Sequence, residues 1–450
     1  MELSRRSFLA GTAAATLTGT SALAAACAPQ TGRNVVMFFI DDLRDWVGYM
    51  GTHPGNVTPN IDALRAESFS FNRAYCAVPT CPGSRASTIW GKRPGNTHVI
   101  SNNLGPRDTL LASNAETIPE LFSSAGFTTY NTGKFFHNAV PDRWDVTLPY
   151  DEIQDFRDTT TPEFKQTFFD FGPLPSGEIH RDQRTATWFS SQIQSAPEKF
   201  FMGVGFYQPH VPWRIPQWAL DLHPLNDVVV PQPNCVDDLD DVPAPGRVLA
   251  NRPIIFGQSN YDRILGTGRA AELVQAYQAA ISHTDAMVGQ VMNALASSPH
   301  ADSTDVLLVS DHGYHLGEKL HWRKATLWEQ ATRVPLLVRS PHLPAGGSLD
   351  SPVSMIDVAP TLLDMAGIAA HAGHDGRSLL GADEAYADAH PVQTNWLFNR
   401  SIRWQKWRYI HYNDGSQELY DLETDPQECT NLIGSPGYEA ITASLRNMRR

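Results

Sequence analysis

Cysteine is scarce in this chain, which has five in 450 residues: Cys27, Cys76, Cys81, Cys235 and Cys429. Their number is odd, their spacing is irregular and no two form a Cys-x-x-Cys pair. The set is therefore too small for a disulfide scaffold and gives no support to a structural zinc site. Cys76, Cys235 and Cys429 could include one disulfide, but the spacing does not choose the pair.

Charged side chains are also few, at 18% of the residues, whereas hydrophobic residues reach 42% and aromatic residues 10%. This balance disfavours a disordered chain and a coiled coil, and it is ample for a large core. The 35 Lys and Arg residues against 48 Asp and Glu residues give a net charge of −13. Nucleic-acid-binding proteins are usually basic, so we expect no nucleic-acid partner. An anionic substrate would need a local cluster of positive charge.

Long hydrophobic runs are lacking as well, since no segment after the N-terminus has about 18 apolar residues in a row. We therefore expect no transmembrane span. The N-terminus itself has Arg5 and Arg6, then an Ala-, Thr- and Gly-rich apolar stretch to Ala26. Residues 1–30 thus resemble a twin-arginine (Tat) signal peptide, which predicts export of the folded protein to the periplasm or the medium. A retained N-terminal anchor is the alternative, and the sequence before Cys27 leaves lipid attachment at that residue open.

Apolar runs alternate with helical patterns along the rest of the chain. Residues 35–40, 200–206, 306–309 and 334–338 are continuous apolar runs, typical of strands buried on both faces. Helices are predicted to begin at Thr58-Pro59 and to span residues 270–295. This alternation predicts an α/β fold with a large doubly wound, mixed or parallel sheet flanked by helices.

The composition also changes along the chain. Residues 212–265 are rich in Pro, Asp and Asn and have no periodicity, which predicts a long ordered excursion near a site, or alternatively a disordered loop. An Ala-, Gly-, His- and Asp-rich stretch before residue 390 separates a main domain, residues 31–390, from a short unit. Alternating bulky residues predict a small antiparallel sheet within that unit, residues 391–450.

Polar side chains follow several of the predicted strands. Asp41 and Asp42 come directly after the first strand, and Asp311 and His312 follow the third. In open α/β sheets ligands bind beyond the carboxyl ends of the strands. Adjacent carboxylates repel each other unless a cation neutralises them, and oxygen-rich sets suit Ca²⁺ or Mg²⁺. A helix cap and a turn are the alternatives for either motif alone, but the joint pattern favours a metal site.

The segment around Cys81 carries a further resemblance. Cys81-Pro82-Gly83-Ser84-Arg85, with Gly91 six residues later, resembles the signature of the sulfatases, which belong to the alkaline phosphatase superfamily. Further motifs fall in the order of that family, and several are most similar to its iduronate 2-sulfatase group. The resemblance spans residues 34–432, and its motifs lie at residues 41–42, 58–62, 117–120, 133–137, 209–214, 311–313, 324 and 418–421.

The resemblance implies a chemistry for the metal set. In sulfatases the signature cysteine, here Cys81, is oxidised to formylglycine by a formylglycine-generating enzyme, and the hydrated aldehyde is the nucleophile. Asp41, Asp42, Asp311 and His312 match the metal ligands, modified Cys81 completes the set, and the ion is usually Ca²⁺. The main domain would then be the catalytic one, and the protein a sulfuric ester hydrolase.

The resemblance also implies roles for five further residues. Arg85, one turn after Cys81, would orient the hydrated aldehyde. Lys134 and Lys324 would stabilise the charge that spreads over the sulfate oxygens in the transition state. His210 would protonate the leaving oxygen, and His137 would take a proton from the second hydroxyl. For each histidine a packed or solvated ring is the alternative.

The substrate class is less closely defined. The iduronate 2-sulfatase group suggests a sulfated sugar, including a uronate, for which Arg214 and Trp213 are candidate contacts to a carboxylate and a sugar face. Other readings are a phosphodiesterase or phosphonate monoesterase, or an inactive glycan-binding relative. The last reading arises because Gly83 stands where the signature has proline, which puts the conversion of Cys81 in question. A two-zinc phosphatase lacks a convincing second set of ligands.

Overall fold

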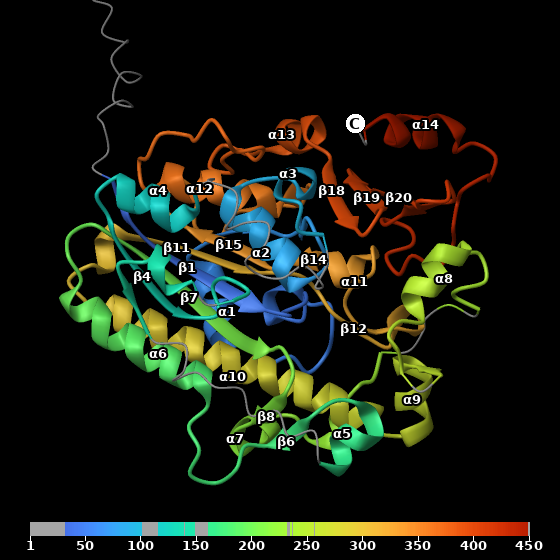
Figure 1. The fold of residues 1–450 in the computed structure, drawn as a ribbon, viewed down its shortest axis with the longest axis horizontal. Helices are drawn as coiled ribbons and strands as arrows, with labels where there is room; N and C mark the ends of the chain where they lie inside the picture. The colour runs from blue at the N-terminus through green and yellow to red at the C-terminus, as the bar shows by residue number, and fades with distance from the viewer. Residues whose placement is uncertain are drawn as a thin grey trace, which may run out of the picture. The chain divides into compact units, whose positions relative to one another are not determined.

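An eight-stranded sheet organises the fold of this computed structural model (Figure 1). Its four central strands, β11, β1, β7 and β4, run parallel, while β15 pairs antiparallel with β11 and with β2. The prediction of a mixed sheet flanked by helices is thereby confirmed. In spatial order the strands are β16 (Ser348–Leu349), β2 (Phe69–Phe71), β15 (Leu336–Arg339), β11 (Thr304–Ser310), β1 (Asn34–Asp41), β7 (Phe200–Pro209), β4 (Thr128–Gly133) and β5 (Val146–Thr147).

The structure describes residues 32–100, 116–138, 140–148, 161–231, 235, 237–255 and 257–448. The predicted signal peptide, Cys27 included, lies outside these residues. Among the described residues no helix combines the length and apolar character that a membrane span requires. Residues from Gly32 onward form one compact unit, and the boundary near residue 390 stays a prediction.

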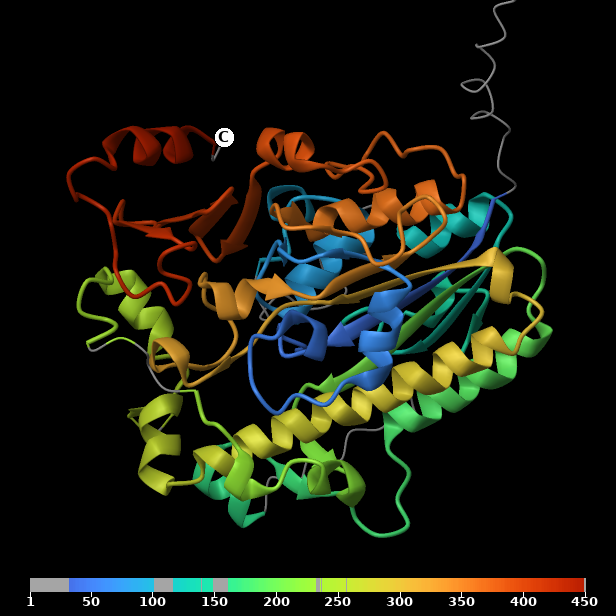
Figure 2. The ribbon, with the colours of Figure 1, turned by 180° about the vertical axis from the view of Figure 1, so that it is seen from behind.

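Strand β1 shows why a continuous apolar run predicts a strand that is buried on both faces of the sheet. Successive strand residues point to opposite faces, so Val36 and Phe38 enter one core cluster and Val35 and Met37 enter the other. Helices α10 and α6 cover the first face, and α2, α4 and α12 cover the second (Figures 1 and 2). Their bounds are α10 (Ala270–Ala296), α6 (Arg181–Gln192), α2 (Cys81–Trp90), α4 (Ile118–Ser124) and α12 (Val358–Met365).

Most predicted elements are present, and one differs. Helix α1 (Pro59–Ala66) begins at Pro59 with Thr58 as its N-cap, and α10 matches the helix predicted at residues 270–295. The strand predicted at residues 334–338 is instead two strands, β14 (Arg333–Val334) and β15, separated by Pro335. Proline has no N–H to donate to a ladder, so one continuous strand was the wrong prediction.

The C-terminal part contains the expected small antiparallel sheet, formed by β18 (Val392–Trp396), β19 (Asn399–Trp404), β20 (Trp407–His411) and β21 (Gln417–Asp421). Arg408 of β20 contacts Glu329, the first residue of α11 (Glu329–Thr332), and lies 2.7 Å from Glu428. The Arg408–Glu329 ion pair joins the small sheet to the main domain, and the Arg408–Glu428 pair lies within the C-terminal part. Helix α14 (Glu439–Met448) follows.

Short elements occupy the described part of the 212–265 excursion. A disulfide joins Cys235 of this excursion to Cys429, which follows the small sheet, and so selects one of the pairs that the sequence left open.

Shorter elements of the chain are β3 (Ala74–Tyr75), α3 (Pro94–Thr97), α5 (Pro162–Thr167), β6 (Phe171–Pro173), β8 (Trp213–Ile215), α7 (Gln217–Asp221), α8 (Ala244–Ala250), β9 (Ile254–Ile255), β10 (Gln258–Ser259), α9 (Asn260–Thr267), β12 (His315–Leu316), β13 (Trp322–Arg323), α11 (Glu329–Thr332), β17 (Val353–Ser354) and α13 (Glu384–Ala389).

Candidate active site

The ends of two neighbouring parallel strands bring the predicted metal ligands together. In the register of β1 and β11, Ile40 lies opposite Ser310, so Asp41 and Asp311 both follow at the same edge of the sheet. The backbone N–H of Asp311 donates to the Ile40 carbonyl oxygen at 3.0 Å. Asp42 then turns out of the strand with a φ of 61°. The Asp-Asp and Asp-His motifs thus meet because their strands pair in parallel.

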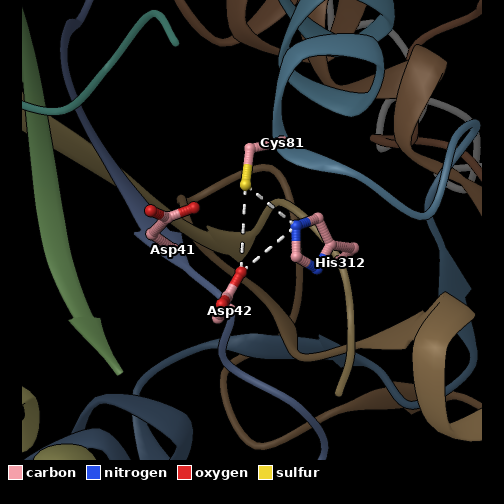
Figure 3. Close-up of side chains that lie close together, drawn as sticks. All are labelled: Asp41, Asp42, Cys81 and His312. Carbon is pink, nitrogen blue, oxygen red and sulfur yellow. Dashed lines mark hydrogen bonds and ion pairs between the residues drawn. The ribbon is translucent and has the colours of Figure 1, made fainter. Parts of the chain in front are cut away.

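Cys81 reaches this edge from the other side, as the first residue of α2 (Figure 3). Its Sγ atom lies 3.3 Å from His312 Nε2 and 3.9 Å from Asp42 Oδ1. The side chain is only 2% exposed. Burial, reinforced by the negative charge of Asp41, raises the pKa of the Cys81 thiol. An unmodified Cys81 is therefore a thiol rather than a thiolate at neutral pH when no cation is bound.

Four of the residues at this edge have the chemistry of a cation site. Asp41, Asp42, Cys81 and His312 each offer one ligand atom, and these atoms lie within 4.8 Å of one another. Asp41 Oδ1 and Asp42 Oδ2 are buried without a hydrogen-bond partner. His312 donates its Nδ1–H to the Gly313 carbonyl oxygen at 2.9 Å, so the lone pair of Nε2 points into the group. The two carboxylate oxygens with free lone pairs fit a hard divalent cation.

Asp311 lies at the same edge but is held by protein donors. Its Oδ1 accepts the backbone N–H groups of Asp42 and His312, each at 3.0 Å. Its Oδ2 accepts Arg85 Nε at 2.9 Å. The carboxylate therefore connects the Asp42 and His312 segments to α2.

Three cations surround the carboxylates: Lys134 and Arg85 are buried, and Lys324 is partly buried. Lys134 contacts Asp41, and Lys324 Nζ lies 2.5 Å from Asp42 Oδ1. Burial opposes ionisation of Asp42, but the Lys324 ammonium outweighs it and keeps the pKa of Asp42 below its usual value. Arg85 is 1% exposed, and its guanidinium lies against Asp311 and also donates to the Phe135 carbonyl oxygen at 2.9 Å. These three cations balance the three carboxylates, so a bound divalent cation would give the site the net positive charge that an anionic substrate requires.

The two predicted histidines lie within electrostatic reach of the same charges. Burial, together with Lys134, lowers the pKa of His137 to about 3, and its Nδ1 is buried without a partner. Burial also lowers the pKa of His210 well below its usual value, although Asp42 opposes this. His210 donates its Nδ1–H to the Val211 carbonyl oxygen at 2.5 Å. In the substrate-free protein both rings are thus neutral, and Nε2 of His210 carries a lone pair.

The two candidate sugar contacts lie elsewhere. Trp213 is fully buried and stacks on Phe169 with a centroid distance of 5.2 Å, so its prediction as a sugar-stacking face is wrong. Successive residues of β8 point in opposite directions, and Arg214 instead lies 2.6 Å from Asp170. Arg214 lines a cavity of about 530 Å³ whose walls include none of the residues of the metal set.

Sequence patterns missed two residues of the site. The Tyr277 hydroxyl donates to the Asp42 carbonyl oxygen at 2.7 Å and accepts the Arg44 N–H at 3.1 Å. The helical spacing of α10 indicated that Tyr277 is buried, but not which polar group its hydroxyl meets. The Tyr207 ring lies 4.8 Å from Lys134 Nζ and also contacts the Arg181 guanidinium. Tyr207 directly follows the apolar run of β7, and this position could have identified it as a residue at the carboxyl end of a strand.

Comparisons with family models identify the fold's relatives. The family model for sulfatases matches residues 33–368, and a model for the C-terminal part of N-sulphoglucosamine sulphohydrolase matches residues 317–449. The first match covers most of the chain. The second match includes the small antiparallel sheet.

Curated proteins give the same family. A sulfatase from Formosa agariphila is 32% identical over 436 residues, covering 92% of this chain and 85% of that protein. Iduronate 2-sulfatase from Mus musculus is 27% identical and covers 74% and 69%. Delta 4,5-hexuronate-2-O-sulfatase from Bacteroides thetaiotaomicron is 26% identical and covers 95% and 90%. The predicted similarity to the iduronate 2-sulfatase group is therefore found, although the Formosa protein has the higher identity.

Solved structures support the fold. A 2-O GAG sulfatase superposes with a TM-score of 0.72 at 24% identity, covering 93% of this chain and 91% of that one. Phosphonate monoester hydrolase of Agrobacterium radiobacter superposes with a TM-score of 0.74 at 20% identity, covering 93% and 95%. The fold is thus shared by enzymes acting on different esters. With the family match over residues 33–368, the chain belongs to the sulfatase family of hydrolases.

Proposed function

We propose that this protein hydrolyses the sulfate ester of a sugar, using formylglycine at position 81 and a bound divalent cation, Ca²⁺ in the first instance and Mg²⁺ as the alternative. One observation carries the proposal: the Cys81 side chain, Lys324 and the acidic pair meet at one point. Lys324 Nζ lies 3.0 Å from Cys81 Sγ and 2.5 Å from Asp42 Oδ1. A group at position 81 is therefore adjacent to both a fixed positive charge and the cation ligands.

The two groups that the chain must acquire have separate tasks. Asp41, Asp42, His312 and the modified residue 81 would hold the cation, with Asp311 beside them. The cation supplies positive charge that favours the ionised form of a nearby oxygen. Formylglycine supplies a hydrated aldehyde, with one hydroxyl for attack on sulfur and a second that lets sulfate leave.

The lysines of the site bind and neutralise the sulfate group. Lys134 is buried and Lys324 is partly buried, and their ammonium groups contact Asp41 and Asp42. The transition state places charge on the non-bridging sulfate oxygens, and fixed cations in a dry site stabilise that charge without reorganisation. Arg85 orients this arrangement through Asp311 rather than through a direct contact with Cys81.

The histidines move the protons. His210 protonates the leaving oxygen from Nε2, because its Nδ1–H is committed to the Val211 carbonyl oxygen. The ring is neutral in the free protein, and the negative charge of a bound sulfate ester raises its affinity for the required proton. His137 has a free Nδ1 and a pKa near 3, so it is a neutral base able to take a proton from the second hydroxyl.

We place the substrate among sulfated sugars, with uronates first. The support comes from relatives named iduronate 2-sulfatase and delta 4,5-hexuronate-2-O-sulfatase. A phosphonate or phosphodiester substrate is the second candidate, because a phosphonate monoester hydrolase shares the fold with a TM-score of 0.74. An inactive, glycan-binding protein follows if Cys81 is not converted.

Maturation and export belong to the same proposal. A formylglycine-generating enzyme would act on Cys81 in the cytoplasm, because the Tat-like segment predicts that the folded protein is exported. The protein would then work in the periplasm or the medium. Anchoring through a lipid on Cys27 is compatible with either place.

Two measurements test the proposal. The first is mass spectrometry of the peptide that contains residue 81, on protein purified from its own host, where we expect formylglycine. The second compares turnover of a 2-O-sulfated uronate disaccharide, 4-nitrophenyl sulfate and bis(4-nitrophenyl) phosphate, with Cys81→Ala as the control. Faster turnover of the phosphodiester would replace the sulfatase assignment. Unmodified cysteine in cation-loaded protein would contradict the mechanism, and binding of the disaccharide without product would favour the inactive relative.

A further inference from the structure

A second buried group of ionisable side chains lies behind the segment that carries His210. His180, Asp182 and His283 each offer one atom within 4.8 Å of the others. His180 and Asp182 stand at the start of α6, and His283 comes from the middle of α10. Asp182 is 1% exposed.

The contacts of this group point to the backbone rather than to a cation. Asp182 Oδ1 accepts the N–H of Tyr207 at 2.9 Å, and Oδ2 accepts the N–H of Gln208 at 2.8 Å. His180 Nδ1 accepts the N–H of Asp182 itself at 3.1 Å. Both carboxylate oxygens and one imidazole nitrogen therefore already meet N–H donors. A carboxylate that accepts two backbone N–H groups fixes the chain there.

Tyr207 and Gln208 are the residues at which β7 leads into the His210 segment. The rest of that segment is also tied down: Gln208 Nε2 donates to the Pro212 carbonyl oxygen at 2.8 Å, and Thr284 donates to the Gln208 carbonyl oxygen at 3.1 Å. The His210 N–H donates to the Tyr207 carbonyl oxygen at 2.9 Å. Asp182 thus fixes the backbone of Tyr207, whose carbonyl oxygen accepts the N–H of His210.

We propose that Asp182 is a positioning residue that sets where the His210 imidazole lies relative to the leaving oxygen of the substrate. The inference rests on the proposed role of His210 as the acid. Proton transfer requires heavy atoms within about 2.6–3.2 Å of each other, so a small displacement of the backbone removes it. A misplacement of about 1 Å can cost about a hundredfold in rate.

Asp182→Asn tests this with little change in volume. The amide keeps one acceptor oxygen but turns an NH₂ group toward one of the two backbone N–H groups, so one end of the clamp is lost. Asp285→Asn is the matched control. Asp285 is also a buried carboxylate, and it accepts the N–H groups of Asn60 and Ile61 at 3.2 and 2.7 Å, but these belong to α1. Both variants lose a hydrogen bond from a backbone N–H to a buried carboxylate. Only Asp182→Asn loses it in the segment that carries His210.

The leaving group provides a readout that general destabilisation would not move. A sugar hydroxyl is a poor leaving group and needs the acid, whereas 4-nitrophenolate does not. On formylglycine-containing, calcium-loaded enzyme, we expect Asp182→Asn to lower kcat about 10–100-fold for a sulfated disaccharide and less than about threefold for 4-nitrophenyl sulfate. KM should change little for either substrate. Asp285→Asn should lower both rates equally or not at all.

A double-mutant cycle with His210→Ala completes the test. If Asp182 acts through His210, adding Asp182→Asn to His210→Ala should cost less than about twofold further on the disaccharide. Additive losses, or equal losses on both substrates, would overturn the positioning role. If His210→Ala itself shows no dependence on the leaving group, the proposed acid is wrong, and this outcome is separate from a failure of Asp182 alone.

Discussion

The Nζ atom of Lys324 lies 3.0 Å from the Sγ atom of Cys81, although the two residues are 243 positions apart in the chain. The same ammonium lies 2.5 Å from Asp42 Oδ1. Lys324 directly follows β13 and is partly buried. One fixed charge therefore touches both the proposed nucleophile and a ligand of the proposed cation.

Replacing this charge should reduce catalysis strongly. We expect Lys324→Met to lower kcat/KM by about 10²–10³-fold, the usual cost of removing one group that stabilises transition-state charge. Steady-state kinetics on 4-nitrophenyl sulfate measure the loss. The formylglycine content of the variant is checked by mass spectrometry, so that a maturation defect is recognised. Lys165→Met, at an exposed lysine of α5, should leave the rate unchanged, and a similar loss there would contradict the assignment.

Removal of the divalent cation should lower both activity and stability. Asp41 Oδ1 and Asp42 Oδ2 are buried without hydrogen-bond partners, so the apo protein keeps them at a cost that the cation removes. We expect chelation to abolish turnover. We expect Ca²⁺ at about 100 times its dissociation constant to raise the free energy of unfolding by about 2.7 kcal/mol. Thermal unfolding with and without Ca²⁺ measures this.

The identity of the ligands is tested by the same titration. Asp42→Asn should lose most of the stabilisation by Ca²⁺, because the amide has no charge to balance the ion. Asp285→Asn, at a buried carboxylate that binds α1, should keep it. A calcium effect of unchanged size in Asp42→Asn would place the cation elsewhere.

Acid should destabilise the fold through two buried histidines. Burial, followed by the neighbouring histidine, lowers the pKa of His283 to about 3, and burial followed by Arg181 lowers the pKa of His180 to about 3. In the unfolded chain a histidine has a pKa of about 6.5. Between these values the unfolded state binds more protons, so the contribution is present above about pH 6.5 and is lost as the pH falls. Each histidine adds a slope of at most about 1.4 kcal/mol per pH unit.

Urea unfolding at pH 7.5 and pH 5.5 measures this slope. We expect the free energy of unfolding to fall between the two values in the wild type, and to fall less in His283→Gln. His342→Gln replaces an exposed histidine and is the control. An equal pH dependence in wild type and His283→Gln would show that His283 is charged or solvated in the fold.

The sheet and the meeting of Asp41, Asp42 and His312 at one edge could be predicted because both follow from local pattern. A strand buried on both faces is a run of apolar residues, and its carboxyl end is the next residue, so Asp41 and Asp311 were found by reading past each run. The break at Pro335 could also have been read, since proline is visible in the sequence and cannot continue a ladder.

Long-range partners could not be predicted in the same way. The pairing of Cys235 with Cys429 spans 194 residues, and no spacing rule selects it. The burial of Trp213 depends on Phe169 and Tyr277, which come from other segments. Asp182 gave no signal, because what it binds is the backbone of Tyr207 and Gln208. These three contacts depend on which distant segments pack together in the fold, and residue type alone does not show which segments do so.

Gly83 departs from the family signature for a reason that the structure makes testable. A Cβ atom at this position would lie 2.6 Å from Val78 Cγ1 and 2.7 Å from the Val99 carbonyl oxygen. Both distances are well inside van der Waals contact, and the carbonyl belongs to the backbone. The close packing of α2 on these two residues therefore favours glycine at residue 83, because proline or any other residue would force Val78 or the backbone of Val99 to shift.

We expect Gly83→Ala to lower the free energy of unfolding by about 1–3 kcal/mol, the usual cost of overpacking. Alanine is the better helix former by about 1 kcal/mol, which works in the opposite direction. Gly95→Ala, in α3 with no atom within 4 Å of the added Cβ, isolates that helix effect and should not destabilise. Adding Val78→Ala to Gly83→Ala should recover part of the loss, since it removes Cγ1 but not the Val99 oxygen. Equal stability of Gly83→Ala and wild type in denaturant unfolding would mean that α2 can move away from Val99, and that packing does not explain the missing proline.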